Sequence, residues 1–144
     1  MKGNVLKIET LPKNNEWRDK PEVMLHANFQ ILVDFVEKEK PQTIVDVKTD
    51  SSQRKWWKET MSLYRYWKKD RPRMKKELSR LARLSGIKMV SVPPKDPKAP
   101  SVEVKFTFKN KSAHNRFSRL EDRLQRLDDE MLQRLINIRH QLWC

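Results

Sequence analysis

The sequence SSQRKWWKETMSLYRYWKKDRPRMKKELSRLAR, residues 51–83, contains two consecutive helical patterns, and the rest of the predicted fold is built around them. It also contains both tyrosines of the chain. Asp50, Ser51 and Ser52 are candidate N-caps for a first helix that runs to about Lys69. Three large apolar side chains recur on one side of this helix, so we expect them to anchor the core. They are Trp56, Leu63 and Trp67.

A proline interrupts the helical pattern inside this stretch. The residue before a proline avoids helical geometry, so we expect a break or sharp kink near Asp70–Pro72. A further helix then carries Met74, Leu78 and Leu81 on one side. Gly86 is well placed as the C′ residue that ends it.

Upstream, residues 1–20 are expected to be partly irregular, with a short strand at 4–9. Asp19 and Pro21 then start an amphipathic helix that ends before Pro41. Residues 43–47 predict a short extended piece. The apolar stripe of the helix comprises Leu25, Phe29, Leu32 and Val36, widened by Ile31 and Phe35.

Downstream, residues 87–92 and 102–109 predict an antiparallel pair of strands joined by a proline-rich loop at 93–101. A long helix then spans residues 112–143, beginning at Ser112 or Asn115. Its apolar stripe is long enough to make self-association through residues 117–142 plausible as a hypothesis. The stripe comprises Phe117, Leu120, Leu124, Leu127, Met131, Leu135, Ile138 and Leu142.

The fold class that follows is α+β and mainly helical, with three or four helices and a small antiparallel sheet. A length of 144 residues fits one domain, 1–144. With 37% hydrophobic and 35% charged residues, we expect a small core and a highly charged surface.

Positive charge is concentrated in residues 51–83, which contain twelve Lys and Arg residues and only three carboxylates. A merely solvated helix face usually mixes both signs, so this imbalance indicates an anionic partner. Trp57 and Tyr64 flank the basic face and are candidates for base stacking, or else only shield the core. The candidate phosphate contacts are Arg54, Lys58, Arg65, Lys69, Arg73, Lys76, Arg80 and Arg83.

Residues that usually carry catalysis do not form a pattern. Two glycines cannot build a P-loop, and a single cysteine provides no cysteine-based zinc site. His140 and Cys144 are spaced i, i+4 without a second pair, and the carboxylates around Asp128 are expected to form solvated ion pairs. A nuclease would need Glu59, Asp70 or Glu103 to cluster beside the basic face. We therefore expect no enzyme activity, no cofactor and no metal.

Three segments resemble a group of small uncharacterised proteins encoded by tailed bacteriophages. They are LHANFQILVDFVE (25–37), WKKDRPR (67–73) and DEMLQRLINIRHQLW (129–143). In that group a tryptophan-rich helix leads into Arg-Pro, and the chain ends just after Leu-Trp. The resemblance implies a phage origin, with the host cytoplasm or the virion as the place of action.

Two functional hypotheses follow. The first is a non-catalytic accessory protein that binds DNA or RNA through phosphate contacts, with an acidic protein surface as the other polyanion. The second is a protein-interaction module, acting on a host or virion protein or assembling with itself through the last helix. No apolar run is long enough to span a membrane, and no signal peptide is expected.

Overall fold

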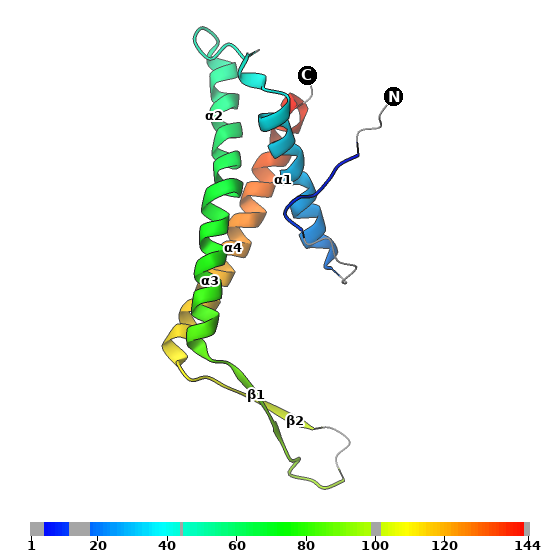
Figure 1. The fold of residues 1–144 in the computed structure, drawn as a ribbon, viewed down its shortest axis with the longest axis vertical. Coiled ribbons are helices and arrows are strands. Elements are labelled where there is room, and N and C mark those ends of the chain that lie inside the picture. Colours follow the sequence, from blue (N-terminus) through cyan, green and yellow to red (C-terminus); the bar gives the residue numbers. More distant parts are fainter. Residues whose placement is uncertain (1–4, 12–17, 44, 99–101, 143–144) are drawn as a thin grey trace. The chain divides into compact units, whose positions relative to one another are not determined.

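The computed structural model describes residues 5–11, 18–43, 45–98 and 102–142. It confirms a mainly helical α+β fold with a long C-terminal helix and a small antiparallel sheet. The chain forms two compact units: the first comprises Met1–Arg71 and Arg126–Cys144, and the second Pro72–Gln125. The elements in chain order are α1 (Lys20–Lys38), η1 (Pro41–Thr43), α2 (Ser51–Arg65), η2 (Tyr66–Asp70), α3 (Arg71–Ser85), β1 (Lys88–Val92), β2 (Glu103–Thr107), α4 (Lys111–Asn137) and η3 (Arg139–Leu142) (Figure 1).

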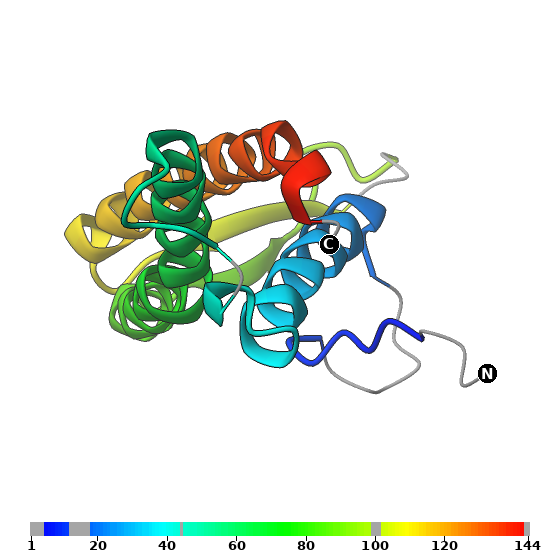
Figure 2. The same ribbon diagram turned by 90° about the horizontal axis from the view of Figure 1, so that it is seen from above.

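The first unit is built on α1, α2 and the C-terminal part of α4, which lie side by side in both ribbon views (Figures 1 and 2). The expected start of α1 after Asp19, with Pro in the first turn, is confirmed. Of its predicted apolar stripe, Leu25, Phe29, Leu32 and Phe35 are buried. Val36 is half-buried, and Ile31 is 47% exposed. Val33, which the predicted stripe did not include, is buried as well.

The start of α2 follows its sequence closely. The side chain of Asp50 accepts hydrogen bonds from the backbone N–H groups of Ser52 (2.8 Å) and Gln53 (3.2 Å), as expected of an N-cap. Further along, Leu63 is fully buried, and the ring of Trp67 stacks on that of Phe29 with centroids 4.4 Å apart. These contacts join α1 to the helical segment that begins with α2.

The expected helix break near Asp70–Pro72 is not found. Instead Tyr66–Asp70 form a π-helical turn that leads directly into α3. The N–H of Arg71 donates to the carbonyl of Tyr66, five residues earlier, and Arg71 keeps helical angles of φ −61° and ψ −49°. The extra residue widens the turn, which makes room for a proline ring that would collide with the preceding carbonyl in a regular α-helix.

The last part of α4 completes the core of the first unit. Leu135 and Ile138 are buried there, with Leu127, Met131 and Leu142 packed against the same cluster. The helix ends at Asn137 and continues as the short turn η3, so the expected helix to residue 143 is slightly too long. Position 143 itself lies outside the described residues.

The second unit contains α3, the two strands and the first part of α4. Gly86 ends α3 with φ +56°, as predicted for a C′ glycine. The strands are antiparallel, with Met89 opposite Phe106 and Ser91 opposite Val104. The first residue of α4 follows Asn110, whose side-chain oxygen accepts a hydrogen bond from the N–H of Ala113 (3.0 Å). The cap is therefore Asn110 and neither Ser112 nor Asn115.

Two other expected extended segments are not strands. Residues 5–8 have no regular structure, and the backbone N–H of Glu9 donates to the buried Gln30 of α1 (3.1 Å). Residues 41–43 form the turn η1, and 45–47 are irregular. β-branched residues alone do not make a strand, because strand stability depends on pairing and packing with neighbouring strands. Residues 4 and 44 lie outside the described part of the chain.

Candidate functional site

The basic face of α2 and η2 is open to solvent in the first unit. Lys58, Arg65 and Lys69 are exposed, and no carboxylate of the described residues lies within ion-pairing distance of them. Arg54 is also exposed, but its guanidinium donates to the carbonyls of Val47 and Lys48, both at 2.8 Å. Arg54 therefore fixes the loop before α2 as well as contributing charge.

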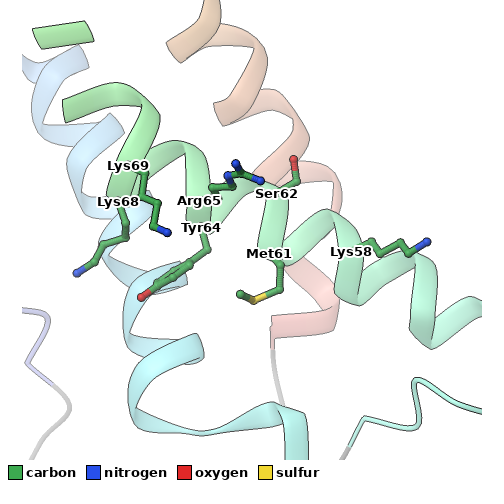
Figure 3. A pocket seen from close by; sticks show the side chains of 7 residues that line it. All are labelled: Lys58, Met61, Ser62, Tyr64, Arg65, Lys68 and Lys69. Atoms are coloured by element: carbon green, nitrogen blue, oxygen red, sulfur yellow. The ribbon is translucent and has the colours of Figure 1, made fainter. Parts of the chain in front are cut away.

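Lys58, Arg65 and Lys69, but not Arg54, line an open hollow of about 660 Å³ on the surface of the first unit (Figure 3). Figure 3 shows the ring of Tyr64 beside Met61, with Lys68 and Lys69 beyond the ring and Lys58 on the far side of Met61. A partner that enters the hollow meets positive charge from several directions and a flat aromatic surface. The lining residues are Lys58, Met61, Ser62, Tyr64, Arg65, Lys68 and Lys69.

Tyr64 is held in place through its hydroxyl group, which donates to Oε1 of Glu37 on α1 at 2.7 Å. The ammonium of Lys68 lies 3.1 Å from the same oxygen. The hydrogen bond to Glu37 raises the pKa of Tyr64 to about 12. The hydrogen bonds from Tyr64 and then Lys68 lower the pKa of Glu37. The ring is therefore fixed before any ligand arrives.

Sequence reasoning did not select Met61 or Lys68. Both lie on the helical row that contains Trp57 and Tyr64, next to the basic row, so the spacing of 57, 61, 64 and 68 was the available signal. Trp57 itself does not line the hollow. It is half-buried, with its ring 6.1 Å from that of Trp56. Of the two proposed stacking residues, only Tyr64 belongs to the hollow.

The other predicted cations lie on α3 in the second unit. All four are exposed. Arg80 is engaged by Glu77, with Nη2 2.5 Å from Oε1. No carboxylate in the described ranges reaches ion-pairing distance of the remaining three, which are Arg73, Lys76 and Arg83.

No protein-family model, curated protein or solved structure matches this chain. Across the described segments, no group of three or more His, Cys, Asp or Glu side chains could hold a metal ion. None of the helices in those segments is both long and apolar enough to cross a membrane.

Two acidic residues, Asp128 and Glu59, form ion pairs within the first unit. Asp128 is buried and pairs with Arg71, so its expected solvated role is wrong. Glu59 accepts two hydrogen bonds from Arg134, at 2.6 and 2.8 Å. The guanidinium of Arg134 therefore makes a bidentate contact with a carboxylate of α2, 75 residues earlier in the chain.

The pair between Glu59 and Arg134 predicts a dependence of stability on pH. The hydrogen bonds from Arg134 hold the pKa of Glu59 below its usual value of 4.5. A carboxylate with a depressed folded-state pKa stabilises the fold fully above its unfolded pKa, and this contribution is lost as the pH falls through the folded value. Urea unfolding of Glu59→Gln between pH 3 and 7 (roughly the range over which a carboxyl titrates) should therefore show a smaller loss on acidification than the unmodified protein.

The matched control for this measurement is Glu39→Gln, which alters an exposed residue at the end of α1. The free energy of unfolding of Glu39→Gln should fall on acidification as much as that of the unmodified protein. If Glu59→Gln and Glu39→Gln lose stability equally on acidification, the Glu59–Arg134 pair does not contribute.

Proposed function

We propose that the protein is a non-catalytic nucleic-acid-binding protein that contacts phosphates through the basic face of α2 and η2. One observation carries the proposal: three unpaired cations surround an open hollow that also contains a fixed aromatic ring. They are Lys58, Arg65 and Lys69, and the ring is that of Tyr64. Unpaired cations in this arrangement suit a polyanion with flat, stackable groups.

Net charge supports the same proposal. The chain carries a formal charge of +13 at pH 7, and an anionic partner relieves the repulsion among these groups. The cations of α3 add phosphate contacts in the second unit. The sequence resemblance to tailed-phage proteins makes phage or host nucleic acid in the host cytoplasm the proposed target, with packaging in the virion as the alternative setting.

The proposal is tested by measuring affinity for a duplex and a single strand over a range of salt concentrations. If about six phosphates are neutralised, log K should fall against log salt with a slope near −5 for the duplex and −4 for the single strand. Counterion release from the nucleic acid is the physical reason. A slope flatter than about −1 would reject phosphate contacts as the basis of binding.

The second proposal, a protein-interaction module that assembles through residues 117–142, has less support. The eight apolar stripe residues of α4 and η3 are all buried or half-buried in the folded chain. In the first unit, Met131, Leu135 and Ile138 belong to or pack against the core. A stripe already covered in this way leaves little apolar surface for a partner.

A further inference from the structure

The two-stranded ribbon β1–β2 exposes large apolar side chains to solvent. Every residue of β2 is exposed, and in β1 only Val92 is half-buried. Met89 is 71% exposed and Phe106 62%, and these two residues face one another across the strands. Figure 1 shows the ribbon extending beyond the ends of α3 and α4 of its own unit. An isolated hairpin with this exposure is marginally stable, so a partner that covers it gains binding energy.

The two faces of the ribbon differ in chemistry. Residues on neighbouring positions of a strand point to opposite faces, so Met89, Phe106 and Val104 share one face. The other face is mixed: it carries Lys88 and Lys105 together with Val90, Val92 and Glu103. Residues 87–110 contain five lysines and only two carboxylates, so the ribbon and its loop carry a net positive charge. The partner that fits it is therefore anionic.

The distribution of these groups selects among anionic partners. A flat surface, such as a membrane or most protein surfaces, covers one face and leaves the lysines of the opposite face pointing away. A groove has a floor and two walls, so it contacts one face and both edges of a ribbon, where long lysine side chains reach the walls. A second copy of the chain is disfavoured because it brings lysines of the same sign together.

We propose that the β1–β2 ribbon binds in the groove of duplex nucleic acid. Its apolar face, centred on Met89 and Phe106, meets the groove floor, and Lys88 and Lys105 reach the phosphates of the walls. A two-stranded ribbon fits the major groove of B-DNA, and Phe and Met side chains are also used as wedges in the minor groove. The inference rests on the proposed function, because it takes nucleic acid as the polyanion, and it adds selectivity for a duplex.

The test compares binding of a fluorescent mixed-sequence DNA duplex and one of its strands by anisotropy, using the full chain. Phe106→Ser and Met89→Ser should each lower duplex affinity about tenfold and leave single-strand affinity within about twofold. The matched controls are Met24→Ser and Ile31→Ser on α1, which are also exposed, at 61% and 47%. Neither control should change duplex affinity.

Phe106→Ser could lower duplex affinity simply by unfolding the ribbon. Two further measurements do not depend on that variant. Lys88→Gln combined with Lys105→Gln should flatten the duplex salt slope by about 1.8, for two phosphates. In a Cys144→Ser background, Met89→Cys carrying an environment-sensitive dye should shift its emission to shorter wavelength on adding duplex, and not on adding single strand.

Several outcomes overturn the inference. Equal losses for duplex and single strand reject groove binding. Capture of anionic vesicles that depends on Phe106 assigns the ribbon to a membrane surface, and a dimer that Phe106→Ser dissociates assigns it to a second copy. If ribbon variants leave duplex binding unchanged while neutralising the α2 cations weakens it, the ribbon inference fails and the proposed function stands. If ribbon variants weaken duplex binding while neutralising the α2 cations does not, the α2 face is rejected as the binding site and the ribbon inference stands.

Discussion

Replacing Asp128 with Ala should lower the free energy of unfolding by about 3–5 kcal/mol, the usual effect of removing one partner from a buried ion pair. Asp128 accepts hydrogen bonds from Nε and Nη2 of Arg71 at 2.9 and 3.1 Å, and from the hydroxyl of Tyr66 at 2.6 Å. The side chains of Arg71 and Asp128 are only 11% and 12% exposed. Without the carboxylate, a buried guanidinium and a buried phenol lose their partner together.

The surroundings make rearrangement difficult. The guanidinium of Arg71 lies over the ring of Trp67, 4.8 Å from its centroid, and that ring stacks on Phe29. Burial, followed by the hydrogen bond to Asp128, raises the pKa of Tyr66. Tyr66 therefore remains a proton donor and cannot replace the lost negative charge near neutral pH.

Equilibrium urea unfolding measures this effect, with Asp129→Ala as the matched control. Asp129 is the exposed neighbour of Asp128 on the same helix, so its replacement should change the unfolding free energy by less than about 0.5 kcal/mol. A loss for Asp128→Ala that is no larger than the control would show that the network gives no net stability to the first unit.

The second large effect concerns binding. The combined replacement of Lys58, Arg65 and Lys69 by Gln should weaken duplex binding several-hundred-fold at about 0.1 M salt and flatten the salt slope by about 2.7. Each lost phosphate contact removes about 0.9 from the slope. All three side chains are exposed and line the same hollow, so their replacement should not disturb the core.

A control with the same change in charge separates a specific face from net charge alone. Lys7, Lys20 and Lys48 are exposed in the first unit and do not line the hollow. Changing these three to Gln should reduce affinity much less than the α2 replacement. Salt titrations of both triple variants, followed by anisotropy, make the comparison. Equal losses would mean that binding follows overall charge and that the hollow has no particular role.

Much of the fold was predictable because it depends on local patterns. The stripe of α1, the cap at Asp50 and the left-handed Gly86 each depend on a few neighbouring residues. The pairing of the two strands was predictable from the alternation of residues 102–108 and from the proline-rich loop that connects this segment to residues 87–92. The π turn before Pro72 was not predictable, because it arises where a proline must fit a helix that the core holds together.

The candidate site was predictable in part. The charge imbalance identified the exposed cations of α2 and α3 correctly as surface groups. The hydroxyl of Tyr64 and the ammonium of Lys68 meet Glu37, which comes from a different helix, so no spacing within α2 indicates that contact. Asp128 was misplaced for the same reason, since Arg71 and Tyr66 are far from it in sequence.

The open strands of the β1–β2 ribbon have a consequence for solubility. A hairpin with unpaired edges and exposed Phe106 and Val104 is a template onto which strands of other molecules can add, and this is the first step of aggregation. Charged residues along such a segment oppose it by electrostatic repulsion. We therefore expect Lys88 and Lys105 to oppose the addition of further strands to this ribbon.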